Sequence, residues 1–120
     1  MEILIVDDSK AMRMIIARVL KKAGYGDNDL REACNGVEAL AAIKEKRPDL
    51  VLADWNMPEM NGIELLQALK AEGIEVDFGL VTSESTAKMR EKAVINGALF
   101  LIAKPFTVES FQEVLSSAVK

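Results

Sequence analysis

Short runs of consecutive apolar residues alternate along the chain with longer segments in which apolar residues recur every three or four positions. Runs without interleaved polar positions are typical of parallel strands that are covered on both faces. The pattern predicts four such strands, at residues 3–6, 50–53, 78–81 and 99–102. A fifth run at 30–33 carries Arg31 and Glu32, which favours a strand at the edge of the sheet.

The segments between the runs have the periodicity of amphipathic helices. Two of them carry broad apolar stripes, formed by Met12, Ile15, Ile16, Val19 and Leu20 and by Val108, Phe111, Leu115 and Ala118. The segment 84–96 has a thinner apolar face, made of Ala87, Ala93 and Val94. A thin face predicts a helix that docks weakly on the sheet and moves more easily.

Capping residues mark the starts of three helices. Asn35 and Asn61 can each accept a hydrogen bond at a helix N-terminus, and a glutamate three residues later can reach back to each of them. Thr107 can cap the last helix in the same way.

The alternation of strands and helices predicts the fold class. Five such units with right-handed crossovers form an α/β fold, a doubly wound, five-stranded parallel sheet with helices on both faces. The length of 120 residues fits a single domain over residues 1–120. An eight-unit barrel would need about twice this length.

The composition removes several classes of function. Against 19 acidic residues stand 15 basic ones, and the net charge of −4 gives no overall electrostatic case for nucleic acid or an anionic membrane as a partner. The absence of histidine and the single cysteine, Cys34, exclude Ser/His/Asp and Cys/His catalysis and a structural zinc site. A lone cysteine, no signal peptide and no long apolar run point to the cytoplasm. We expect Cys34 to be a small buried hydrophobe.

Polar residues that can do chemistry follow four of the predicted strands. These residues are Asp7 and Asp8, Asp54, Thr82, and Lys104. The carboxyl ends of parallel strands line the crevice where open α/β sheets bind ligands, so we expect these residues to converge on one site. Trp55, next to Asp54, is expected to be a partly exposed neighbour of that site.

Three crowded carboxylates repel one another, and a hard cation such as Mg2+ relieves the repulsion. The aspartate cluster therefore predicts a magnesium site. A carboxylate can also attack phosphorus, and the acyl phosphate that forms needs an ammonium and hydroxyl donors besides the cation. Lys104 and Thr82 supply these two groups.

These residues, in this order and spacing, resemble the response-regulator receiver domains of two-component signalling. The resemblance covers essentially the whole chain, and its motifs are Ile3 to Ser9, Asp54 to Pro58 followed by Asn61-Gly62, Thr82, and Lys104-Pro105-Phe106. It implies a flavodoxin-like sheet with strand order 2-1-3-4-5. The stretch Asp54 to Pro58 is especially similar to chemotaxis regulators, so chemotaxis is one pathway that the resemblance implies.

By position, the resemblance implies that Asp54 accepts a phosphoryl group from a histidine kinase. The chain would then be a signalling domain, with no enzyme activity beyond self-catalysed phosphotransfer and autodephosphorylation. The implied cofactor is Mg2+, held by Asp7, Asp8, Asp54 and the backbone carbonyl of Asn56. Lys104 would pair with the phosphoryl group, Thr82 would move its hydroxyl toward it, and the Lys104–Pro105 peptide would be cis.

The resemblance also implies an output surface, formed by the helix within 84–96, the strand 99–102 and the helix that follows Thr107. This face would bind a downstream protein, with no direct contact to nucleic acid or membrane. Leu101 stands at the switch position, where the family usually has Tyr, Phe or His, so any coupling through it must be steric. Ser83 stands where the chemotaxis regulators have alanine.

Other functions compete with this interpretation. A haloacid-dehalogenase-like phosphatase needs a titratable aspartate two residues after its nucleophile, where this chain has Asn56. A flavodoxin-like electron carrier needs a hydroxyl- and glycine-rich loop after the first strand, where this chain has Asp7-Asp8-Ser9-Lys10. A receiver-like scaffold that is never phosphorylated, or a phosphate sink, is the remaining alternative.

Overall fold

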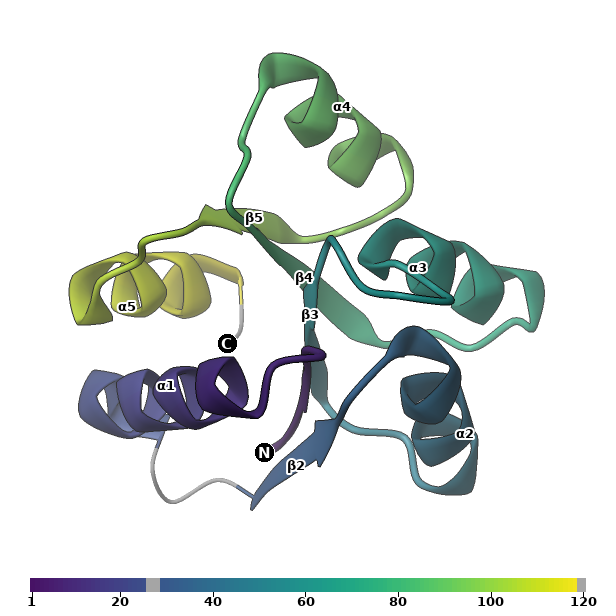
Figure 1. Ribbon diagram of the computed structural model, residues 1–120, viewed down its shortest axis with the longest axis horizontal. Helices are drawn as coiled ribbons and strands as arrows, with labels where there is room; N and C mark the ends of the chain where they lie inside the picture. Colours follow the sequence, from purple (N-terminus) through teal and green to yellow (C-terminus); the bar gives the residue numbers. More distant parts are fainter. Residues whose placement is uncertain (26–28, 119–120) are drawn as a thin grey trace.

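The computed structural model describes residues 1–25 and 29–118. At its centre is a sheet of five parallel strands in the order β2-β1-β3-β4-β5, which confirms the predicted fold class and strand order (Figure 1). The strands are β1 (Glu2–Val6), β2 (Asp29–Ala33), β3 (Leu50–Asp54), β4 (Asp77–Thr82) and β5 (Phe100–Ala103). The more polar strand β2 lies at an edge, as its charged residues predict.

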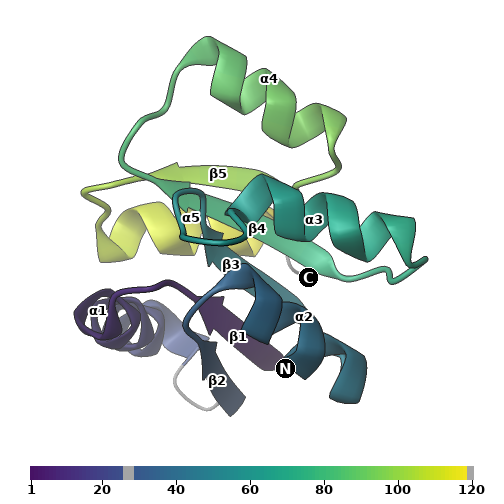
Figure 2. The same ribbon diagram turned by 45° about the vertical axis from the view of Figure 1, so that its right-hand side comes forward.

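Helices cover both faces of the sheet (Figures 1 and 2). On one face lie α1 (Lys10–Leu20) and α5 (Val108–Ala118), and on the other lie α2 (Gly36–Glu45), α3 (Gly62–Ala71) and α4 (Ala87–Ile95). A short π-helical turn, η1 (Lys21–Tyr25), continues α1. Within the described ranges, no helix is both long and apolar enough to cross a bilayer.

Strand β1 shows why the apolar runs are continuous. Ile3 and Ile5 pack with the buried residues of α1 and α5, whereas Leu4 and Val6 pack with those of α2 and α3. Successive side chains of a strand point to opposite faces, so a strand between two helical layers needs apolar residues at every position. The sheet therefore separates two hydrophobic clusters.

The caps form as predicted, with one difference at α2. Asn61 accepts from the amide of Glu64, and the Glu64 side chain accepts from the amide of Asn61. Asn35 likewise accepts from the amide of Glu38 at 2.7 Å. The Glu38 carboxylate reaches one residue further back, however, and accepts from the amide and the thiol of Cys34. Cys34 is thus a half-buried hydrogen-bond donor rather than a buried hydrophobe.

At the last helix, Thr107 accepts from the amide of Ser110 at 3.1 Å, and Ser110 returns a hydrogen bond by accepting from the amide of Thr107. The predicted cap at α5 is therefore present, with a serine in the reciprocal position.

Two predicted apolar faces are corrected by the structure. In α4 only Ala93 is buried, while Val94 is 71% exposed, since it is turned about 100° from Ala93 around the helix. In α1 the buried stripe runs through Ile16 and Leu20, and Ile15 is 44% exposed. The weak docking predicted for α4 therefore rests on an even smaller buried face.

Candidate functional site

Four strands deliver the predicted site residues to one edge of the sheet. Asp7 follows the last residue of β1, and Asp54 ends β3 beside it, because Val6 pairs with Ala53. Thr82 is the last residue of β4, one position beyond the pairing partner of Asp54. Lys104 directly follows β5. Residues almost a hundred positions apart thus meet at the carboxyl ends of the strands.

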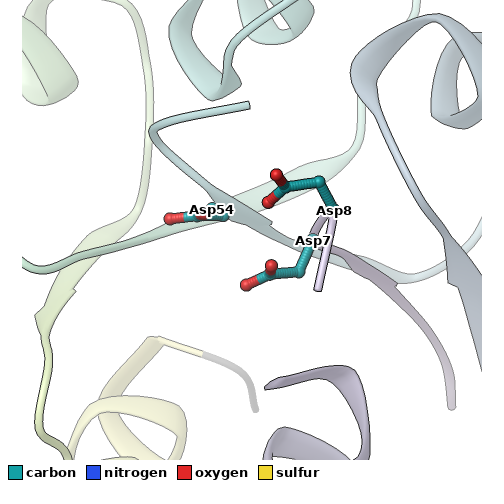
Figure 3. A group of neighbouring side chains, drawn as sticks. All are labelled: Asp7, Asp8 and Asp54. Atoms are coloured by element: carbon teal, nitrogen blue, oxygen red, sulfur yellow. The ribbon is translucent and has the colours of Figure 1, made fainter. Parts of the chain in front are cut away.

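Asp7, Asp8 and Asp54 form the acidic cluster of the site. Figure 3 shows the three side chains gathered where β1 and β3 end. Each offers a carboxylate oxygen, and these oxygens all lie within 4.8 Å of one another. Asp7 and Asp54 are buried, with 1% and 8% exposed, while Asp8 is exposed to solvent.

Lys104 is the basic residue of this cluster. Its Nζ lies 3.3 Å from Oδ1 of Asp54 and 3.5 Å from Oδ2 of Asp7. Its backbone amide donates to the carbonyl of Thr82 at 2.7 Å, and the peptide that joins it to Pro105 is cis, as the family resemblance implies. One ammonium therefore faces two buried carboxylates.

Burial governs the protonation of these two carboxyl groups. Removal from water raises the pKa of Asp7, against the opposing effects of the Ser9 amide, which donates to it at 2.9 Å, and of Lys104. Burial and the neighbouring charge of Asp7 raise the pKa of Asp54, against Lys104 and the amide of Asn56. A further cation at the site would favour the charged form of both groups.

The donor set fits a hard cation. Oδ2 of Asp7 is buried and accepts no hydrogen bond from the described residues. Apart from the ion pair with Lys104 at 3.5 Å, this buried oxygen has no partner that satisfies it, which is costly, and two further carboxylates lie within reach of the same ion. Oxygen-only donors of this kind are the ligands that Mg2+ prefers.

Other predicted residues lie around this cluster. Thr82 is fully buried, and its Oγ1 accepts from the amide of Glu84 at 3.1 Å. Asn56 is exposed, and its backbone amide opposes the rise in the pKa of Asp54. Trp55 was predicted to be partly exposed, but it is buried, with 8% exposed. It belongs to the hydrophobic cluster that contains the buried residues of α3.

Leu101 lies in the middle of β5. It is partly buried against the hydrophobic cluster between the sheet and the layer of α2, α3 and α4. It pairs with Leu80, and Thr82 pairs with Ala103. Paired residues of parallel strands face the same side, and so do residues two apart along a strand, so Leu101 and Thr82 face the same layer. The predicted switch pair therefore shares one face.

The loop after β3 depends on Gly62. Its amide donates to the carbonyl of Trp55 at 3.0 Å, and a Cβ at this position would lie 2.7 Å from the carbonyl oxygen of Asp54. Because that neighbour is backbone, only glycine lets α3 begin this close to Asp54.

One residue of the site was missed in the sequence. Arg13 donates from Nη1 to the backbone carbonyl of Asp7 at 2.7 Å. It precedes the buried Ile16 and Leu20 by three and seven positions, so it occupies the buried stripe of α1. A charged residue on an apolar stripe was the available signal.

A parallel sheet of this strand order, with helices on both faces, defines the class of flavodoxin-like α/β proteins, and the acidic site lies at the carboxyl end of the sheet, where this class binds its ligands. The chain belongs to the response regulator receiver domain family, whose model matches residues 3–116. Membership in this family places it in two-component signalling, as a signalling domain.

Similar proteins agree with this assignment. The chain is 38% identical over 117 residues to chemotaxis protein CheY-3 of Vibrio cholerae, covering 96% of this chain and 88% of that protein. It is 35% identical over 112 residues to sporulation initiation phosphotransferase F of Bacillus subtilis, covering 93% and 88%. The solved structure of chemotaxis protein CheY4 of Vibrio cholerae matches with a TM-score of 0.86 at 28% identity, covering 98% of both chains.

Proposed function

We propose that Asp54 accepts a phosphoryl group from a histidine kinase in a Mg2+-dependent reaction, and that the change alters the surface of α4, β5 and α5 for a downstream protein. The observation that carries this proposal is the surroundings of Asp54: a buried carboxylate 3.3 Å from Lys104, with two further carboxylates within 4.8 Å. Residues 1–120 would act as one receiver domain in the cytoplasm, without binding nucleic acid or membrane directly.

The geometry favours Asp54 over its two neighbours as the phosphoacceptor. Oδ1 of Asp7 already accepts a hydrogen bond from the Ser9 amide. Asp8 is exposed and forms no ion pair with Lys104 among the described residues. Asp54 combines burial with a close ammonium, which offsets the charge that develops on the phosphoryl oxygens.

The proposed step exchanges one bond to phosphorus for another. A carboxylate oxygen of Asp54 bonds to phosphorus while the bond from phosphorus to the kinase imidazole nitrogen breaks, and that electron pair stays on nitrogen. Lys104 pairs with the phosphoryl oxygens. Mg2+, when bound, neutralises further charge on the phosphoryl group, and the residues that would hold it are Asp7, Asp8, Asp54 and the backbone carbonyl of Asn56.

Thr82 and Leu101 would carry the signal away from Asp54. The Thr82 hydroxyl must leave the Glu84 amide to reach a phosphoryl group on Asp54. Its movement opens space on the face that it shares with Leu101. The similarity to chemotaxis protein CheY-3 supports chemotaxis as the pathway.

A second candidate is a phosphate sink, which accepts the phosphoryl group without a change at the output surface. The observation that favours it is Leu101, because leucine offers less surface than an aromatic ring for a steric switch.

The test is incubation with phosphoramidate, with and without Mg2+, followed by intact mass measurement. We expect one added phosphate on the wild type with Mg2+ and none on Asp54→Asn. Asp8→Asn, which keeps the acceptor, should lose most of the Mg2+-dependent rate. Unchanged mass of the wild type would support a scaffold that is never phosphorylated, and a phosphate that persists in Asp54→Asn would place the acceptor elsewhere.

A further inference from the structure

Arg13 is a largely buried cation of α1 to which the proposed phosphotransfer assigns no role. Its side chain is 14% exposed, and it lies on the same stripe as the buried Ile16 and Leu20. Burying a guanidinium is costly unless its donors find partners. The partners of the Arg13 guanidinium therefore indicate the role of this residue.

The guanidinium forms hydrogen bonds with two groups from different parts of the chain. Nη1 donates to the backbone carbonyl oxygen of Asp7 at 2.7 Å, and Nε donates to Oε1 of Glu32 at 2.8 Å. Glu32 lies near the end of β2, where it pairs with Ile5 of β1. The planar fork of arginine suits two acceptors in fixed directions, which a lysine could not satisfy together.

The Asp7 carbonyl belongs to the peptide group that joins the two acidic residues of the β1–α1 loop. Because this group is planar, the direction of the Asp7 oxygen fixes the direction of the Asp8 amide, and so the position from which the Asp8 side chain leaves the backbone. The preceding peptide is held separately, since the Asp7 amide donates to the carbonyl of Ala33 at 3.1 Å. Among the described contacts, Arg13 alone holds the Asp7 oxygen.

Glu32 has a second effect on this arrangement. A lone guanidinium beside a cation site would repel the incoming ion, but the ion pair with Glu32 balances its charge. Arg13 can thus orient the loop with little electrostatic penalty for a bound metal.

We propose that Arg13 is a positioning residue of the acidic site, which aligns the Asp7–Asp8 peptide so that both carboxylates ligate one divalent cation. This inference rests on the proposed Mg2+-dependent function. Residues that orient metal ligands in this way commonly change metal affinity by about 10- to 100-fold when they are removed.

The test measures Mn2+ binding without phosphodonor, by the electron paramagnetic resonance signal of the free ion, since oxygen-donor sites for Mg2+ also accept Mn2+. We expect Arg13→Ala to weaken binding about tenfold or more. Arg13→Lys should recover only part of the loss, and Glu32→Gln should weaken binding by a smaller factor. The matched control is Arg18→Ala. Arg18 is an exposed arginine of the same helix, and its side chain forms no hydrogen bond or ion pair with the described residues. The Arg18→Ala protein should bind Mn2+ as tightly as the wild type does.

The sign of the change separates the possible roles of Arg13. A purely electrostatic role predicts tighter binding in Arg13→Ala, because a cation near the site is removed. A purely structural role predicts a lower thermal midpoint with unchanged affinity in the folded protein. Either result would overturn the inference while leaving the proposed function intact. If Arg13→Ala does not fold, unchanged affinity in both Arg13→Lys and Glu32→Gln would overturn it, and a wild type that binds no Mn2+ would overturn the proposed function as well.

Discussion

The ammonium of Lys104 lies 3.3 Å from Oδ1 of Asp54 and so joins the end of β5 to the end of β3. The same ammonium lies 3.5 Å from Oδ2 of Asp7, so one positive charge serves two buried negative ones. The metal-free site therefore carries an excess of negative charge whenever both carboxyl groups are ionised. The first three predictions follow from this excess.

Replacing Lys104 with methionine should destabilise the metal-free protein at neutral pH. A hydrogen bond to a charged group contributes about 1.5–3 kcal/mol, and its loss leaves two buried carboxylates without a counter-ion. Urea denaturation at neutral pH measures the change. The control is Lys88→Met on the exposed side of α4, which should change the free energy of unfolding by about 0.5 kcal/mol or less. Equal effects of the two substitutions would show that Lys104 does not stabilise the acidic cluster.

The metal-free protein should gain stability from the site as the pH falls through the raised pKa values of Asp7 and Asp54. The pKa values of Asp7 and Asp54 are raised by burial, so the folded protein holds these protons more tightly than the unfolded chain. This contribution is fully present below the ordinary aspartate value of about 3.9 and is lost as the pH rises through the raised values. Comparing the pH dependence of unfolding in EDTA for the wild type and Asp54→Asn isolates the effect. A parallel dependence for the two proteins would contradict it.

Mg2+ should stabilise the folded protein, because unfolding disperses the three carboxylates. At ten times its dissociation constant the metal adds about 1.4 kcal/mol to the free energy of unfolding. Asp8→Ala should abolish this gain and also stabilise the metal-free protein, since the charge of Asp8 opposes ionisation of Asp7. Thermal unfolding with and without Mg2+ provides the measurement, and a wild-type midpoint indifferent to Mg2+ would rule out a binding site in the folded state.

Much of the fold was predictable from local signals. Residues 3–6 of strand β1 are all apolar because they lie between two helical layers. Asn61 marks the start of α3 because its side chain accepts from the amide of Glu64 and the Glu64 side chain accepts from the amide of Asn61. The convergence of Asp7, Asp54 and Lys104 followed from the rule that parallel strands end at one edge.

The features that were missed depend on contacts between different helices, strands and loops. Trp55 is buried within the hydrophobic cluster that also contains the buried residues of α3, and no local pattern encodes this packing. Arg13 contacts a backbone oxygen and a residue of another strand, which the periodicity of α1 does not show. The predicted apolar face of α4 was wrong at Val94, because apolar character alone does not show which side of the helix faces the sheet: Ala93 is buried there, with Met89 partly buried, while Val94 is exposed.

Gly62→Ala should cost about 1–3 kcal/mol of stability and slow phosphorylation of Asp54. The added methyl group would lie 2.7 Å from the Asp54 carbonyl oxygen, so β3 or the start of α3 must shift next to the phosphoacceptor. The comparison is Gly73→Ala, where a Cβ meets nothing within 4 Å and the cost comes from the positive φ of 71° alone. Both variants should lose stability in urea, but only Gly62→Ala should slow phosphorylation by phosphoramidate. A normal rate in Gly62→Ala would mean that the site tolerates the shift.

The last prediction concerns the output surface. Leu101 and Thr82 face the same layer of the structure, where α4 contributes one buried residue, Ala93, and the partly buried Met89. When Thr82 moves toward a phosphoryl group, Leu101 can enter the vacated space, and α4 offers little resistance to the adjustment. Because a two-state equilibrium shifts only by the difference in interaction that the two states offer, the smaller leucine should give a smaller shift than an aromatic ring.

Backbone NMR with beryllofluoride and Mg2+ should therefore show changes at α4 and β5 as well as next to Asp54. Thr82→Ala provides the control, because it keeps the acidic cluster but removes the hydroxyl that starts the movement, so its changes should stay near Asp54. Leu101→Tyr should enlarge the response of α4 in a protein that still carries Thr82. A wild type in which residues 84–103 stay silent would exclude this surface as the output and favour the phosphate sink, since phosphorylation would then end at Asp54 without a change for a partner to bind.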